Sequence, residues 1–527
     1  ILTSVLDWAA PRNIGFSLLA SLGDMADVDF GDMLDYLAND ADTRAILLYI
    51  EGVTHARKFM SAARAAARTK PVIVVKAGRH AAAAKAAASH TGALAGVDAV
   101  YDAAFRRAGM LRVLTLEELF DAVETLALAR APRGERLAIL THGGGVGVMA
   151  TDALMDAGGT LATLSAETLA KLDAVLPATW SRANPIDIIG DASAERYTAA
   201  LQAVLGAPEV DALLVLNCPT AVTSPDEAAS AVLAALPSPI KHSLFTSWVG
   251  GVGAAPARAR FRAAGVPTYD APEDAVRGFM QMVDYRRNQA ALLETPPSMP
   301  ADFAPELGSA RAIIAVALAE QREWLSELEA KSILASFGIP TVATRLATTP
   351  ALAAEYAADI GGRVALKIVS RDITHKSDVG GVCLDLAASE VLAAAEAMTA
   401  RVREARPDAH IEGYAVQAMI SRPLAHELIV GVLDDHEFGP VLLFGAGGVA
   451  VEVLNDRALS LPPLNLKLAH DVIARTRVAK LLAGYRQVPA ADVEAIAVTL
   501  VRLSQLVISL PQVAELDINP LLADADG

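Results

Sequence analysis

The sequence predicts an α/β protein in which two doubly wound parallel sheets precede an α+β domain. A chain of 527 residues is too long for a single hydrophobic core. Up to about residue 287, short apolar runs alternate with helical patterns, an order typical of parallel sheets covered by helices. From residue 321, apolar runs follow one another closely, which favours an antiparallel sheet. We therefore expect domains at 1–128, 129–287 and 321–527, joined by a linker at 288–320.

The composition limits the possible partners. The formal net charge is −16, which opposes non-specific binding of nucleic acid, because such binding depends on basic patches. The apolar stretch 493–510 is interrupted at helical spacing by Arg502, Ser504 and Gln505. We expect a helix of the core there and no membrane span.

The two cysteines, Cys218 and Cys383, lie far apart in apolar runs. This spacing predicts neither a disulfide framework nor a metal site, so we expect two core residues. Their number is typical of a protein of the reducing cytoplasm.

In the first domain, the apolar runs 45–50 and 71–76 predict parallel strands, and Glu51 directly follows the first run. Doubly wound sheets bind ligands at the carboxyl ends of their strands. A carboxylate there is about as often a solvated loop residue or a helix cap. In the functional interpretation, Glu51 holds one ring N–H of a histidine and leaves the other nitrogen nucleophilic.

The candidate histidine is His90, which lies within 89–96 between an alanine-rich run and a segment of small residues. We expect a mobile loop that carries the imidazole. A lone histidine in such surroundings is more often a surface or capping residue, although histidine is also the commonest acid, base and nucleophile near neutral pH.

The second domain begins with the apolar run 137–140, which enters a glycine loop at 143–147 and then a helix through Met155. Backbone N–H groups at such a helix N-terminus favour an anion, so Gly143, Gly144 and Gly145 are candidate phosphate-binding residues. Glycine loops also occur as plain tight turns. The polar segment 184–191 is either a structured loop or part of the same site.

In the third domain, Lys367 lies within the apolar run 364–369 and requires an anionic partner, either a phosphate or a carboxylate. The polar segment 375–382 is either a solvated hairpin or a phosphate-handling loop. Near the end of the chain, Asp517 and Asn519 alternate with apolar residues and would share one face of a strand. Two oxygen ligands on one face suit Mg²⁺.

Together these motifs resemble the NDP-forming acyl-CoA synthetases, of the ADP-forming acetate–CoA ligase type in the succinyl-CoA synthetase superfamily. The resemblance covers nearly the whole chain. The segments that carry it are 89–96, 143–147, 184–191, 375–382 and 515–521.

The resemblance implies two flavodoxin-like CoA-ligase domains followed by an ATP-grasp domain. It implies the reaction acid + CoA + ATP ⇌ acyl-CoA + ADP + phosphate, through an acyl phosphate and a phosphohistidine. His90 would then carry the phosphoryl group, Glu51 would stabilise it, and His375 would match a second phosphorylated histidine of some members.

The family also implies ATP or ADP, Mg²⁺ and CoA as cofactors, with a small carboxylic acid or acyl-CoA and phosphate as partners. It further implies a cytoplasmic homo-oligomer with no nucleic-acid or membrane partner. Lys367 would meet the nucleotide phosphates, the adenine hinge would be Gln417, Ala418 and Met419, and Glu427 would lie near the nucleotide. Asn519, together with Asp517, would bind Mg²⁺.

Two departures from the family pattern lead us to expect a fragment trimmed at both ends, which need not be active by itself. The family begins with a Rossmann-like CoA-binding domain that is absent before Ile1, and it continues to a further acidic Mg²⁺ ligand beyond Gly527. An alternative function is a regulatory, ligand-sensing module of a protein lysine acetyltransferase. The presence of His90 and Glu51 favours catalysis.

Overall fold

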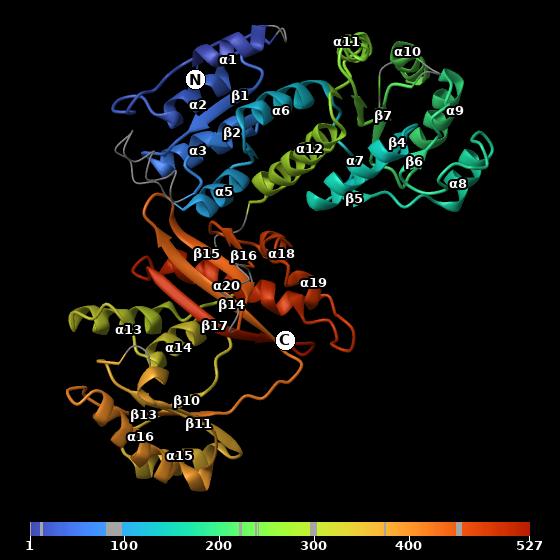
Figure 1. The fold of residues 1–527 in the computed structure, drawn as a ribbon. Coiled ribbons are helices and arrows are strands. Elements are labelled where there is room, and N and C mark those ends of the chain that lie inside the picture. Colours follow the sequence, from blue (N-terminus) through green and yellow to red (C-terminus); the bar gives the residue numbers. More distant parts are fainter. Residues whose placement is uncertain are drawn as a thin grey trace. The chain divides into compact units, whose positions relative to one another are not determined.

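The computed structural model describes residues 2–10, 14–80, 97–220, 224–237, 240, 242–295, 303–373, 376–448 and 456–527. The chain divides into two compact units, Ile1–Glu294 and Thr295–Gly527 (Figure 1). The division falls within the segment 288–320. The domain boundaries expected from the sequence stay a prediction.

Unit 1 begins with a small parallel sheet of order β1-β2-β3. Its strands are in register from the pair Ile46 and Val72 to the pair Ile50 and Lys76. The elements are α1 (Leu2–Ala9), α2 (Phe30–Asn39), β1 (Ile46–Ile50), α3 (Ala56–Ala67), β2 (Val72–Lys76), α5 (Asp98–Arg107), β3 (Leu111–Val113) and α6 (Leu116–Leu128).

The second sheet of unit 1 is also parallel, with order β5-β4-β7-β8-β9, and β6 also pairs with β4. Strands and helices alternate along the chain, which confirms the predicted α/β class. The elements are β4 (Arg136–Thr141), α7 (Gly144–Asp156), β5 (Thr160–Leu161), α8 (Ala166–Asp173), β6 (Ile186–Asp187), α9 (Ala194–Leu205), β7 (Ala212–Asn217), α10 (Pro225–Ala235), β8 (Leu244–Trp248), α11 (Ala255–Ala263), β9 (Thr268–Tyr269) and α12 (Pro272–Leu293).

Strand β4 is buried on both of its faces, which explains its unbroken apolar sequence. Ala138 and Leu140 belong to the core on one side of the sheet. Leu137 and Ile139 belong to the core on the other side, where α12 contributes Phe279. A strand with one solvated face would instead alternate apolar and polar residues.

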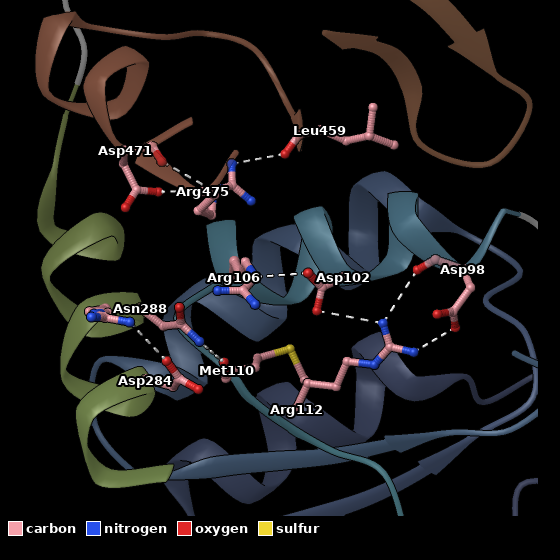
Figure 2. A network of polar contacts seen from close by, with 11 residues as sticks. Asp98, Asp102, Arg106, Met110, Arg112, Asp284, Asn288, Leu459, Asp471 and Arg475 are labelled. Carbon is pink, nitrogen blue, oxygen red and sulfur yellow. Dashed lines mark hydrogen bonds and ion pairs between the residues drawn. The ribbon is translucent and has the colours of Figure 1, made fainter. Parts of the chain in front are cut away.

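The long helix α12 also contacts the first sheet of unit 1. Asn288 Nδ2 donates to the carbonyl oxygen of Met110 at 2.7 Å (Figure 2). Gln289 Nε2 donates to the carbonyl oxygen of Gly109 at 2.8 Å. In the same view, Arg112 reaches Asp98 Oδ1 at 2.5 Å. Because the amides of Asn288 and Gln289 satisfy carbonyl groups beside the first sheet, helix α12 joins the two sheets of unit 1.

The described residues of unit 2 form two four-stranded antiparallel sheets, of order β10-β13-β11-β12 and β16-β15-β14-β17. Helices α15 and α16 pack on the first sheet, and α18 and α20 pack on the second. The elements are α13 (Leu307–Ala319), α14 (Glu327–Ser336), β10 (Thr344–Ala347), α15 (Pro350–Ile360), β11 (Arg363–Val369), η2 (Ser377–Val379), β12 (Val382–Ala387), η3 (Ala388–Glu390), α16 (Val391–Ala405), β13 (Gly413–Ala418), β14 (His426–Asp435), β15 (Gly439–Ala446), β16 (Arg457–Ser460), α18 (Leu466–Ala474), α19 (Ala479–Leu482), α20 (Val493–Ser509) and β17 (Glu515–Ala523).

The apolar stretch near the end of the chain forms the predicted core helix, α20. Ser504 is fully buried, and its hydroxyl accepts the backbone N–H of Leu464 at 2.9 Å. In the described part of the chain, no helix is both long enough and apolar enough to cross a bilayer. The two cysteines differ from the expectation, since Cys218 and Cys383 are only partly buried.

Helix α20 offers a test of this packing. We expect Leu503→Ala to lower the free energy of unfolding by about 2–5 kcal/mol, because it leaves a cavity at a fully buried position. The control is Ile508→Ala on the same helix, whose side chain is 45% exposed and should change stability far less. Urea unfolding of both variants measures the difference, and equal losses would contradict a buried inner face.

Candidate active site

The carboxyl ends of β1 and β2 bring a carboxylate and a cation to one edge of the first sheet. Glu51 follows β1 and accepts the hydroxyl hydrogen of Tyr49 at 3.2 Å. Lys76 ends β2 and is nearly fully buried. Its Nζ donates to the carbonyl oxygen of Ala77 at 2.6 Å and lies 4.6 Å from the ring centre of Tyr101.

Lys76 is a residue that the sequence analysis missed, although a lysine that closes an apolar run was a visible signal. His90 lies in 81–96, outside the described residues. The contact between Glu51 and His90 therefore stays a prediction. The structure shows that Glu51 is half-buried at the edge of a parallel sheet, where ligands bind in this class of fold.

The glycine loop lies at a point where the order of the second sheet reverses. From β4 the chain runs to β5 and β6 on one side, and then to β7 on the other side. Gly143 caps α7 with no side-chain hydrogen bond, and the first turn of the helix has no acidic residue. Backbone N–H groups at such a helix start can bind an anion.

Two side chains crowd the glycines at the start of α7. A Cβ atom on Gly143 would lie 2.5 Å from Cys218 Sγ, and one on Gly144 would lie 2.9 Å from Asp187 Oδ2. A Cβ atom on Gly145 would meet nothing within 4 Å. A side chain at position 143 would therefore displace Cys218, whereas one at position 144 would meet only the end of the Asp187 side chain.

The segment 184–191 is a structured loop, as one of the two alternatives expected, and a functional role for it stays a prediction. Asn184 is structural, because its amide accepts from Ile139 N at 2.9 Å and donates to the carbonyl oxygens of Leu137 and Ala162. Asp187, at the end of β6, instead lies beside the glycine loop, and its Oδ1 accepts from Ile189 N at 2.9 Å. This carboxylate therefore lies next to the start of α7.

A buried chain of hydrogen bonds begins at His142, directly before the glycine loop, and no sequence pattern predicted it. His142 Nδ1 and the Tyr197 hydroxyl lie 2.5 Å apart. The hydroxyl donates to the carbonyl oxygen of Leu216 at 3.1 Å and accepts from Asn217 Nδ2 at 3.1 Å. Burial lowers the pKa of His142, which favours the neutral imidazole.

In unit 2, three lysines surround the carboxylate of Glu327, the first residue of α14. Glu327 Oε1 accepts from Lys331 and from Lys367 at 2.9 Å each, and Oε2 accepts from Lys376 at 3.2 Å. The anionic partner expected for Lys367 is therefore present as a carboxylate. Burial acts to raise the pKa of Glu327, but the hydrogen bonds from Lys367 and Lys331 outweigh it and hold this pKa at about 2.

Lys331 links this cluster to the expected adenine hinge. Its Nζ donates to Gln417 Oε1 at 2.7 Å and to Thr344 Oγ1 at 2.8 Å. Within the hinge, Ala418 is paired with Val364 in the sheet. The backbone N–H of Met419 donates to the carbonyl oxygen of Arg363 at 2.9 Å and is therefore already engaged.

Glu427 is exposed on β14 and faces a glycine-rich turn. Its carbonyl oxygen accepts from Gly447 N at 2.8 Å, and a Cβ atom on Gly448 would lie 2.9 Å from its Oε2. The expected contact of Glu427 with the nucleotide stays a prediction. His375 falls outside the described residues, whereas the adjacent Lys376 belongs to the lysine cluster.

Asp517 and Asn519 are both exposed on β17 and alternate with the less exposed Leu516 and Ile518. Partial burial, with Glu515 adding a like charge, raises the pKa of Asp517, and a cation nearby would lower it. A carboxylate and an amide oxygen are donors that fit Mg²⁺. Among the described residues, no group of three or more His, Cys, Asp or Glu residues could hold a metal ion without further ligands.

Three family models match successive parts of the chain. Residues 1–126 match the succinyl-CoA ligase-like flavodoxin domain, residues 137–270 match the ligase-CoA domain, and residues 316–527 match the ATP-grasp domain.

Relatives match over nearly the whole chain. The acetate–CoA ligase [ADP-forming] I of Archaeoglobus fulgidus is 38% identical over 524 residues, which cover 99% of this chain and 74% of the relative. The 4-hydroxybutyrate–CoA ligase [ADP-forming] of Nitrosopumilus maritimus is 33% identical and covers 100% of this chain and 75% of its own length.

Among solved structures, the dinucleotide-forming acetyl-coenzyme A synthetase 1 of Ca. Korarchaeum cryptofilum, in complex with phosphate and ADP, is 35% identical. It superposes with a TM-score of 0.52, over 56% of this chain and 64% of that chain. The present chain thus spans about three quarters of the length of the two relatives named above, and the superposition covers less than two thirds of the solved chain.

The crowding at the start of α7 gives a prediction with an internal control. We expect Gly143→Ala to destabilise unit 1 by about 1–3 kcal/mol, because its methyl group overlaps Cys218 Sγ. Gly145→Ala should instead be neutral or stabilise by up to about 1 kcal/mol, since the space is open and alanine favours helix. Thermal melting measures both changes, and Cys218→Ala in the Gly143→Ala background should restore stability if the overlap is the cause.

The Glu327 cluster predicts a dependence of stability on pH. The pKa of Glu327 in the folded protein, about 2, lies below the ordinary value of 4.5, so its stabilisation is present above pH ~4.5 and is lost as the pH falls towards 2. We expect Glu327→Gln to lower the free energy of unfolding by about 2 kcal/mol at pH 7, and by much less near pH 3.

Urea unfolding at both pH values measures this difference. The control is Glu323→Gln at an exposed glutamate, for which we expect a change within about 0.5 kcal/mol at either pH. A loss in Glu327→Gln that stays constant between pH 7 and pH 3 would contradict the assignment.

Proposed function

The chain belongs to the family of ADP-forming acetate–CoA ligases, and on that premise we propose that it joins a small carboxylic acid to CoA with ATP as the energy source. The observation that carries the proposal is the lysine cluster around Glu327, next to the expected adenine hinge in the region that matches ATP-grasp domains. Ammonium groups gathered there are suited to the phosphates of a nucleotide.

The first step would be transfer of a phosphoryl group to His90. One ring nitrogen of His90 attacks the γ-phosphorus of ATP, the bond from that phosphorus to the β–γ bridging oxygen breaks, and ADP leaves. Glu51 would accept the N–H of the other ring nitrogen and so keep the attacking nitrogen unprotonated. Lys367 would offset negative charge on the phosphates during the transfer.

The second stage would form the acyl-CoA. A carboxylate oxygen of the acid attacks the phosphorus of phospho-His90, the P–N bond breaks, and an acyl phosphate results. The CoA thiolate then attacks the acyl carbon and releases phosphate. Backbone N–H groups at Gly144 and Gly145 would hold the phosphoryl group at the start of α7, where the helix dipole favours an anion. Gly143 would line this site without donating to it, because its own N–H already donates to Thr141 Oγ1 at 3.0 Å.

Mg²⁺, when bound, would neutralise phosphate charge, and Asp517 and Asn519 are the described residues that would hold it. Gln417, Ala418, Met419 and Glu427 would surround the base, and His375 is a candidate for a second phosphorylated histidine. A homo-oligomer and a cytoplasmic location stay predictions.

No observation favours the alternative function as a regulatory module of a lysine acetyltransferase. The two relatives named above are ligases by name. The regulatory interpretation also gives no reason for a phosphate-binding helix start and a lysine cluster in the same chain.

Phosphoryl transfer can be measured without CoA. We expect the purified protein, incubated with ATP labelled at the γ-phosphate and Mg²⁺, to gain an acid-labile label on His90, and we expect His90→Ala to abolish it. The control is His410→Ala at an exposed histidine, which should leave labelling unchanged. Peptide mapping would separate label on His90 from label on His375, and full labelling of the His90→Ala variant would overturn the assignment.

A further inference from the structure

The three lysines around Glu327 differ in how many of their protons the protein itself uses. An ammonium group has three N–H donors. Lys331 donates to Glu327 Oε1 at 2.9 Å, to Thr344 Oγ1 at 2.8 Å and to Gln417 Oε1 at 2.7 Å. All three of its donors therefore have acceptors within the protein.

Within the described parts of the protein, Lys367 and Lys376 have fewer acceptors than Lys331. Each has one acceptor among the described residues, which is a carboxylate oxygen of Glu327. Within the part of the chain that the structure describes, two N–H donors on each side chain therefore have no protein acceptor, and a ligand could accept them. Both side chains are about three-quarters buried, so the lost hydration favours a bound anion there.

The shared carboxylate decides where these two ammonium groups can lie. Lys367 comes from β11 and Lys376 from the segment before η2, and Glu327 contacts one with each of its oxygens. Like charges this close repel each other, and a carboxylate between them offsets that repulsion. Lys331 holds the same carboxylate and also gives Gln417 a single amide orientation, with Oε1 towards Lys331.

We propose that Glu327 and Lys331 are positioning residues of the nucleotide site: they hold Lys367 and Lys376 for the phosphates of a nucleoside di- or triphosphate, and Lys331 itself does not contact those phosphates. This inference rests on the proposed function, because it takes a nucleotide as the ligand.

The test is a double-mutant cycle read by calorimetric titration with ADP. Glu327→Gln keeps the side-chain volume and removes the charge, and we expect it to raise the Kd for ADP about tenfold, because two ammonium groups lose their charged partner. Lys331→Met should also weaken binding. In the Glu327→Gln background, however, we expect Lys331→Met to change the Kd by less than about twofold, because both residues act through the same arrangement.

Two results would overturn the inference. One is an ADP affinity of Glu327→Gln that equals or exceeds that of the wild type. The carboxylate would then either have no effect on binding or compete with the phosphates for the lysines. The other is a double variant whose Kd for ADP rises by the product of the two single-variant increases. Such independence would indicate that Lys331 binds the phosphates directly.

The matched control is Glu329→Gln on the same helix. Glu329 accepts from Arg322 at 2.8 and 2.9 Å and from Ser326 N at 2.7 Å, and it contacts none of the three lysines. We expect this variant to melt at a lower temperature and to bind ADP within about twofold of the wild type. Failure of the wild type to bind ADP would overturn the proposed function, whereas tight binding by both the wild type and Glu327→Gln would overturn the positioning role alone.

Discussion

The pairing of parallel strands is the constraint on which the architecture of unit 1 depends. Parallel strands end at the same edge of a sheet, so residues that follow different strands are brought together there. In the first sheet this edge holds Glu51 and Lys76. In the second sheet it holds the glycine loop after β4 and Cys218 after β7. Helix α12 packs against the second sheet and satisfies carbonyl groups beside the first, so both edges belong to one compact unit.

The candidate site of unit 2 is formed by charged side chains, whereas the candidate sites of unit 1 depend on where the parallel strands end. The sheets of unit 2 are antiparallel, and its candidate site consists of long side chains that converge from a helix, a strand and a loop. One carboxylate among three ammonium groups leaves an excess of positive charge. Phosphates are the natural counterions for such an excess, and the residues on β17 proposed to bind magnesium would serve the same polyanion.

The sequence predicted the longer buried strands, such as β4 and β11, because their apolar runs directly reflect burial, whereas short strands such as β3 and β5 carry no such run. It also indicated that Lys367 needs an anionic partner, since an isolated charge in a strand is costly. It could not identify Glu327 as that partner, because the contact joins residues 40 positions apart and Glu327 looks like an ordinary residue in the first turn of a helix. The chain from His142 through Tyr197 to Asn217 was hidden for the same reason, since each residue alone fits a buried strand or helix.

The contact between Gly143 and Cys218 has a consequence for evolution within the family. The two residues follow different strands, yet they share a space too small for a methyl group on one and a sulfur atom on the other. Substitutions at these two positions should therefore be correlated: a lineage that acquired a side chain at 143 would need a smaller residue at 218. If this glycine is invariant, the size of the neighbouring side chain at 218 would be one reason for it, beside any need to bind a phosphate.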